Sequence, residues 1–111
     1  AILRVQHWLQ ANGAVEVSLT AMAEQAGLEE RTFLRRFRAA TGLKPTQYCQ
    51  HLRVGKAREM LEFTNGTIDH IAWNVGYADP GAFRATFKKI TGLAPSDYRS
   101  RFGVTPAAVA R

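Results

Sequence analysis

Apolar residues recur along this chain with the spacing of helices, and no stretch of useful length alternates apolar and polar residues as a strand does. The helices that this pattern predicts cover residues 2–11, 19–26, 29–41, 45–64, 68–75, 80–91 and 95–102. The pattern therefore predicts an all-α fold of about seven helices.

Residues that start and stop helices stand at the expected ends of these segments. Ser18 and Thr67 precede two of them and suit the N-cap position, where a side-chain oxygen accepts a bond from a free backbone N–H. Asp79 offers a cap and is followed by proline at the first helical position. Gly27 suits the left-handed conformation that ends a helix.

The apolar stripes predict which side chains form the core. The residues expected to face inward are Ile2, Val5, Trp8, Leu9, Leu19, Met22, Ala23, Ala26, Phe33, Leu34, Phe37, Tyr48, Leu52, Ala57, Met60, Leu61, Ala82, Phe83, Phe87 and Ile90. Leu28 and Tyr77 are expected to cover the core from the turns. Arg53 and Arg58 are expected to pair within the chain, with Glu59, Glu62 or Asp69 as partners.

The chain nearly repeats itself. Gly27 and Gly76 lie 49 positions apart, and Phe37 and Phe87 lie 50 apart within a shared pattern of apolar, glycine and proline positions. Each copy has a short helix with a small alanine, a glycine-containing turn and a second helix, which is the helix-turn-helix arrangement. A partner with a translational repeat, such as DNA, fits two like units.

We expect one module, 1–111, in four parts: a first helix-turn-helix unit at 1–44, a linker helix at 45–64, a second unit at 65–102 and a tail at 103–111. A helix of about 20 residues is roughly 30 Å long, close to the roughly 34 Å of one DNA turn. One chain could thus place two recognition helices in successive major grooves, on an asymmetric site.

Charge supports a polyanionic partner. Fifteen Lys and Arg against nine Asp and Glu give a net charge of +6 and a pI near 10.1, which favours nucleic acid but also fits an anionic membrane surface. No apolar run reaches the roughly 18 residues of a spanning helix, and no signal peptide is present, so an intracellular protein is expected. The chain starts at Ala1 without Met, which indicates a fragment of a longer protein.

A small basic chain of this kind leaves three alternatives to DNA binding: a small enzyme, an RNA binder and a basic protein-interaction module. Cys49 is the single cysteine, lies between core positions and has His51 only two residues away, so it lacks the paired base of a nucleophile. The histidines form no spaced metal-ligand set. RNA reading favours exposed aromatic residues, whereas the phenylalanines here stand at core spacing.

Several motifs are similar to the DNA-binding domain of AraC/XylS-type transcription regulators. They are Ala-Glu-Gln-Ala-Gly at 23–27, Arg-Thr-Phe-Leu-Arg-Arg-Phe at 31–37, Thr-Gly-Leu-Lys-Pro at 41–45, the stretch from Arg53 through 57–61, Ile-Asp-His-Ile-Ala at 68–72 and Gly76-Tyr77. The resemblance covers about residues 4–102. The sequence of the second unit is similar to that of the subfamily whose N-terminal half resembles an amidotransferase or DJ-1-like domain.

The resemblance implies which residues meet DNA. The base-reading residues that it implies are Arg31, Thr32, Leu34, Arg35 and Arg38 in the first unit and Asp79, Pro80, Gly81, Arg84, Ala85 and Lys88 in the second. Arg36, Thr67 and Lys89 are expected to contact phosphates, and Arg84 and Lys88 are expected to contribute phosphate contacts from the second unit as well. The first unit, with its arginines, is expected to dominate sequence choice, and the apolar residues of the second to meet thymine methyl groups.

The same resemblance implies partners and setting. Double-stranded DNA is the expected ligand, RNA polymerase is a candidate partner, and neither a cofactor, a metal nor a catalytic residue is expected. The isolated domain is expected to be a monomer in the cytoplasm, without a membrane partner, and the full-length protein to dimerise through an N-terminal domain outside this sequence.

Overall fold

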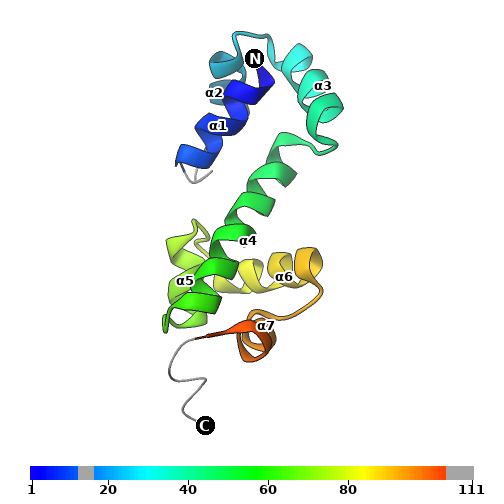
Figure 1. Ribbon diagram of the computed structural model, residues 1–111. Coiled ribbons are helices and arrows are strands. Elements are labelled where there is room, and N and C mark those ends of the chain that lie inside the picture. Colours follow the sequence, from blue (N-terminus) through cyan, green and yellow to red (C-terminus); the bar gives the residue numbers. More distant parts are fainter. Residues whose placement is uncertain (13–16, 105–111) are drawn as a thin grey trace. The chain divides into compact units, whose positions relative to one another are not determined.

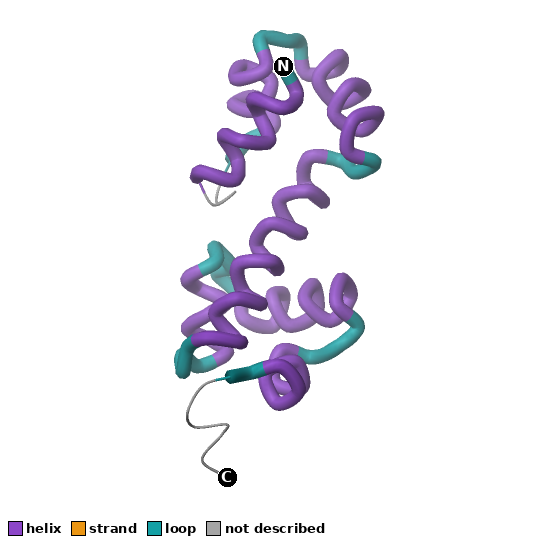
Figure 2. The backbone as a smooth tube through the Cα atoms, viewed as in Figure 1, coloured by secondary structure: helices purple, strands orange, loops and turns teal. Residues whose placement is uncertain are grey.

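The computed structural model describes residues 1–12 and 17–104, and these residues form seven helices and no strand (Figure 1, Figure 2). The helices are α1 (Ile2–Asn12), α2 (Leu19–Ala26), α3 (Glu30–Thr41), α4 (Pro45–Phe63), α5 (Ile68–Asn74), α6 (Pro80–Thr91) and α7 (Pro95–Phe102). The predicted all-α fold is confirmed, with each helix end within about one residue of its expected place. The predicted tail lies mostly outside the described residues. No helix in the described ranges is both long and apolar enough to cross a membrane.

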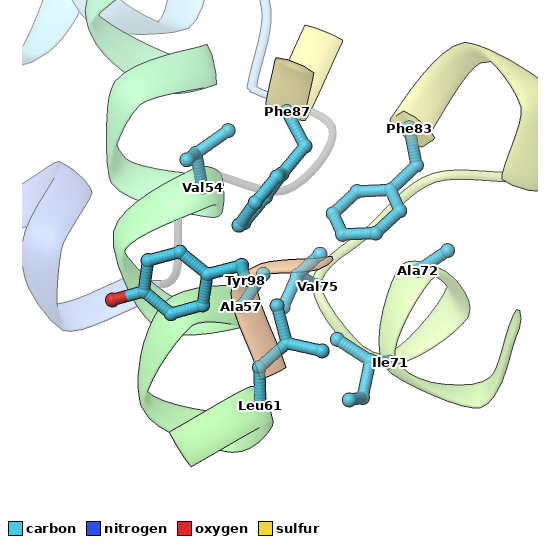
Figure 3. Close-up of a cluster of buried hydrophobic side chains, with 9 residues drawn as sticks. All are labelled: Val54, Ala57, Leu61, Ile71, Ala72, Val75, Phe83, Phe87 and Tyr98. Atoms are coloured by element: carbon cyan, nitrogen blue, oxygen red, sulfur yellow. The ribbon is translucent and has the colours of Figure 1, made fainter. Parts of the chain in front are cut away.

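The chain divides into two compact units, Ala1–Leu52 and Arg53 onward, and the boundary falls inside α4. The first core contains Val5, Leu9, Met22, Ala23, Ala26, Phe33, Phe37 and Cys49. The second contains Val54, Ala57, Leu61, Ile71, Ala72, Val75, Phe83, Phe87 and Tyr98, which come from α4, α5, α6, α7 and, for Val75, the residue directly after α5 (Figure 3). Each half of α4 thus contributes to a different core.

The sequence repeat is also a repeat of contacts. In the first unit the Phe37 ring lies 5.4 Å from Phe33 and 5.3 Å, edge to face, from Tyr48. In the second unit Phe87 lies 5.7 Å from Phe83 and 5.5 Å, again edge to face, from Tyr98. Such tilted aromatic pairs are favourable beyond the area they bury. Both units therefore build their cores around the same three rings.

Helices α3 and α6 end in the same way. Thr41 Oγ donates to the Phe37 carbonyl at 2.8 Å and accepts from the Leu43 N–H at 3.1 Å, and Thr91 repeats this pattern in α6. The glycine that follows each threonine adopts a left-handed conformation, with φ of 78° at Gly42 and 86° at Gly92. A residue with a β-carbon is strained there.

Two glycine substitutions should have opposite effects on stability. Gly42→Ala should lower the free energy of unfolding by about 1–2 kcal/mol, because alanine is strained at positive φ. Gly55→Ala should raise it by about 0.5–1 kcal/mol, because Gly55 lies inside α4 and a β-carbon there meets nothing within 4 Å. Urea denaturation measures both, and a Gly42→Ala variant as stable as the unchanged chain would contradict the argument.

Helix α7 is held to the end of α4 by contacts that the sequence pattern did not predict. Arg99 donates to three backbone carbonyl groups, those of Leu61 at 3.2 Å, Thr64 at 3.0 Å and Gly66 at 2.6 Å. These groups lie at or beyond the last turn of α4, where carbonyls lack helical partners. Arg99 thus closes the second unit between its first and last helices.

The two arginines expected to pair within the chain both lie over tyrosine rings. Arg53 lies 5.4 Å from the centre of the Tyr77 ring. Arg58 Nε donates to the Tyr98 hydroxyl at 3.1 Å, and that hydroxyl donates to Glu62. The bond to Tyr98, together with the nearby Glu62 carboxylate, raises the pKa of Arg58. Both arginines therefore make contacts within the chain, as expected, and Arg58 is linked to Glu62 through the Tyr98 hydroxyl.

Candidate nucleic-acid interface

The first helix-turn-helix consists of α2, the turn after it and α3. Ser18 caps α2 by accepting from the Ala21 N–H, and Gly27 ends it with φ of 70°. The Leu28 N–H then donates to the Ala23 carbonyl at 3.1 Å, and the Leu28 side chain packs on the core as predicted. A further bond, from Thr20 Oγ to the Glu30 carboxylate at 2.7 Å, ties α2 to the start of α3.

Helix α3 buries one side and exposes a basic one. Phe33 and Phe37 are fully buried on the core side. The predicted base-reading residues Arg31, Leu34, Arg35 and Arg38 are all exposed, and Thr32 is half-buried. Within the described part of the chain none of these arginines forms an ion pair, so their guanidinium groups are available to a ligand.

Leu34 was expected both in the core and on the base-reading face, and its exposure agrees only with the second expectation. The apolar pattern places it inward with the two phenylalanines, but its side chain is 38% exposed. The reason is helical geometry, since Phe33 and Phe37 stand one turn apart and a residue next to Phe33 is rotated by about 100° away from it. Leu34 therefore belongs to the same exposed face as Arg31 and Arg38, where the resemblance implies it.

The second helix-turn-helix consists of α5, its turn and α6. Thr67 caps α5 by accepting from the His70 N–H, and the Tyr77 N–H donates to the Ala72 carbonyl at 2.9 Å, as Leu28 does to Ala23 in the first unit. Asp79 caps α6 by accepting from the Gly81 N–H. Both turns of the repeat thus have the same hydrogen bond, and both predicted caps of this unit are confirmed.

The exposed face of α6 differs chemically from that of α3. Its exposed residues are Gly81, Ala82, Arg84, Ala85, Lys88 and Lys89, with Asp79 exposed before them and Pro80 half-buried. Ala82 was expected to face inward, and this is wrong, because the core side of the helix is formed by the buried Phe83 and Phe87 with Ile90 packed beside them. Helix α6 therefore presents small residues and three cations, where α3 presents arginines.

One of those cations is paired. Arg84 Nη2 lies 2.7 Å from Asp69 Oδ1, and both side chains are about half exposed. Asp69 lies in the first turn of α5, so this contact joins the two helices of the second helix-turn-helix. The sequence gives no sign of it, because residues 15 positions apart meet here only through the turn between their helices.

The residues considered for other functions lie elsewhere. Cys49 is only 7% exposed within the first core, where its thiol lacks the access that a nucleophile needs. Among residues 1–12 and 17–104, no group of three or more His, Cys, Asp or Glu side chains lies close enough to hold a metal ion.

The predicted phosphate-contacting residues Arg36, Thr67 and Lys89 are all exposed.

A family model described as a helix-turn-helix domain matches residues 22–101. The transcriptional activator RhaS of Escherichia fergusonii is 36% identical over 92 residues, which are 83% of this chain and 33% of that protein. RhaS of Escherichia coli strain SE11 is also 36% identical over the same length. The chain thus spans about a third of the length of the curated relatives it matches.

Solved structures agree with this fold. The DNA-binding domain of AdpA, a global transcriptional factor crystallised in complex with a target DNA, is 31% identical, with a TM-score of 0.84 and 91% of each chain covered. The C-terminal domain of AraT, a response regulator from Geobacillus stearothermophilus, is 25% identical, with a TM-score of 0.86 over 95% of this chain and 88% of that one. With the second helix-turn-helix and nearly all of the first inside the matched residues 22–101, this chain belongs to the AraC-type helix-turn-helix family of transcription regulators.

Proposed function

We propose that this chain is the DNA-binding module of a transcription regulator and reads double-stranded DNA by sequence, with α3 and α6 in successive major grooves. The observation that carries the proposal is the exposed face of α3, where Arg31, Arg35 and Arg38 stand opposite the buried Phe33 and Phe37. The likeness to the AdpA domain in complex with a target DNA supports it.

The chemistry of α3 suits base reading. A helix with its side chains fits the roughly 12 Å wide major groove, and an arginine there can donate two parallel bonds to guanine O6 and N7. Each such pair discriminates against the wrong base by about 1–3 kcal/mol. Arg31, Arg35 and Arg38, with Thr32 and Leu34 beside them, give the first unit the larger part of the specificity.

The second unit adds affinity through phosphate contacts and a different base preference. Lys88 and Lys89 on α6, with Thr67 before α5 and Arg36 in the first unit, contact phosphates, which position a protein without reading sequence. Gly81 and Ala85 are small enough for close approach to thymine methyl groups. Asp79 and Pro80 form the N-terminus of α6, which would enter the major groove first. Arg84 is the single arginine of α6.

The length of α4 supports binding by one chain. Its 19 residues correspond to roughly 28 Å, near the roughly 34 Å between equivalent faces of successive major grooves. Residues 1–44 and 65–102 then act as two reading units, with 45–64 as their connection. Because the two units are unlike, the site on DNA is asymmetric and needs no second copy.

For the whole protein, we propose a cytoplasmic regulator that dimerises through an N-terminal domain and meets RNA polymerase at its promoters. The amidotransferase or DJ-1-like type is our candidate for that domain. The isolated module binds as a monomer and neither catalyses a reaction nor holds a cofactor.

Selection from a random duplex pool tests the proposal. The 111-residue chain is mixed with the pool at roughly physiological salt, and the bound fraction is sequenced. We expect an asymmetric motif with two blocks about 10 base pairs apart. A motif with one block would show that α6 supplies affinity without reading, and salt-sensitive binding without enrichment would refute sequence-specific binding by this chain.

Lys88→Ala tests the phosphate role of α6. The substitution should weaken binding to selected and random duplexes by the same factor, because phosphates are the same in every sequence. The slope of log K against log salt concentration should become shallower by about one unit, since one fewer counterion is released. Fluorescence anisotropy at several salt concentrations measures both, and a changed base preference would assign Lys88 to the bases instead.

A further inference from the structure

The ion pair between Asp69 and Arg84 carries an inference beyond the location of the interface. We propose that Asp69 is a positioning residue, which holds Arg84 in one geometry to read a guanine and reduces the affinity of the second unit for random DNA. This inference rests on the proposed function.

The geometry leaves Arg84 able to bind while it is held. A guanidinium group has five N–H donors, and the 2.7 Å contact from Nη2 to Asp69 Oδ1 engages one of them. Both side chains remain about half exposed, so the contact does not bury the other donors. Thr67 caps the start of α5, two residues before Asp69, and this holds the backbone that carries the Asp69 carboxylate.

Stability is a poor explanation for this pair. Exposed ion pairs contribute little to folding, since solvent screens them and two long side chains must be ordered. The corresponding positions of the first unit are Thr20 and Leu34, which cannot form an ion pair, and Thr20 instead joins α2 to α3 through its bond to Glu30. The first unit thus folds around an equivalent set of three rings without a charged pair at this place, and the charges of Asp69 and Arg84 point to a role of the second unit beyond folding.

Positioning matters most on α6 because the helix has a single arginine. Arginine has a flexible side chain, and ordering it at the moment of binding reduces affinity. A carboxylate that orders Arg84 beforehand removes part of this penalty for a guanine at the matching place. The same negative charge repels phosphates, so it lowers affinity for DNA that lacks the guanine.

Asp69→Asn keeps the shape and removes the charge. We expect affinity for the selected duplex to fall about threefold to tenfold, with preference relaxed at one guanine, while affinity for random duplexes stays equal or rises. Asp97→Asn is the matched control, because Asp97 is also exposed in the first turn of a helix of this unit. It should leave the base preference unchanged. Urea denaturation of each variant shows that it is folded.

A double-mutant cycle separates positioning through Arg84 from a general charge effect. In an Arg84→Ala background, Asp69→Asn should no longer change the base preference, because the side chain that it positions is gone. An equal change in preference with and without Arg84, or an equal gain in affinity for every duplex in both backgrounds, would overturn the inference.

The outcomes also distinguish this inference from the proposed function. If the unchanged chain enriches no motif, sequence-specific binding fails and the inference fails with it. If a motif is enriched but Arg84→Ala or Asp69→Asn leaves every base preference intact, the proposed function stands and the positioning role is refuted.

Discussion

Arg35→Ala is expected to reduce affinity for the selected duplex by about 1–3 kcal/mol, or roughly fivefold to 150-fold, and to relax the preference at one or two base pairs. Arg35 lies in the middle of the exposed face of α3, away from the buried Phe33 and Phe37. Its loss removes a bidentate donor and leaves the acceptors of the guanine edge unpaired in the groove. The affected bases should lie in one block of the motif, because only the first unit is changed.

The control is Arg4→Ala, which removes the same charge from an exposed residue on α1, outside the helix-turn-helix. It should weaken binding slightly and equally for all sequences, as a loss of long-range attraction does. Anisotropy with selected and random duplexes, followed by repeated selection with each variant, makes the comparison. An equal loss on selected and random DNA for Arg35→Ala would remove Arg35 from the reading face and assign it to phosphate.

The fold was predictable because its boundaries are set locally. Ser18, Thr67 and Asp79 each cap a helix through a bond that reaches only two or three residues along the chain. The glycine that ends α3 and the glycine that ends α6 stand at positive φ, where other residues are strained. Signals of this range are visible in the sequence before any tertiary contact is known.

Small and intermediate apolar residues were harder to place. Leu34 and Ala82 each stand beside a phenylalanine that fills the core side of its helix, and both are exposed. Hydrophobicity alone cannot predict whether such a residue is buried when a larger neighbour already fills the apolar side of the helix. At Leu34 the error concerned packing only, since the resemblance already placed this residue on the reading face.

The contacts that distinguish the second unit were beyond the reach of the pattern. Arg99 meets carbonyl groups more than 30 positions earlier in the chain, and Arg58 meets Tyr98 at a separation of 40. Asp69 and Arg84 are closer in sequence, but their contact depends on how the turn sets one helix against the other. The charge of these residues predicts that they lie near the surface. Which of them contact each other is visible only in the folded unit.

The largest expected change in stability follows from Phe87→Ala. Phe87 is fully buried, with Phe83 on one side and Tyr98 on the other, at 5.7 and 5.5 Å between ring centres (Figure 3). Truncation of a buried phenylalanine to alanine destabilises by about 3–5 kcal/mol, because apolar contacts are lost and a cavity is left. A small unit has little apolar surface to bury and correspondingly little stability, so this loss is a large part of it.

Phe63→Ala provides the matched control, because Phe63 is in the same unit but is 65% exposed, and the chemical change is the same. Its effect should stay within about 0.5 kcal/mol, as for most surface substitutions. Urea denaturation followed by circular dichroism compares the two variants. If Phe87→Ala were no more destabilising than Phe63→Ala, the three-ring core could not be what holds α6 in place. In that case the exposed face of α6, with Arg84 and Lys88, would lack the rigid support that base reading in a groove requires.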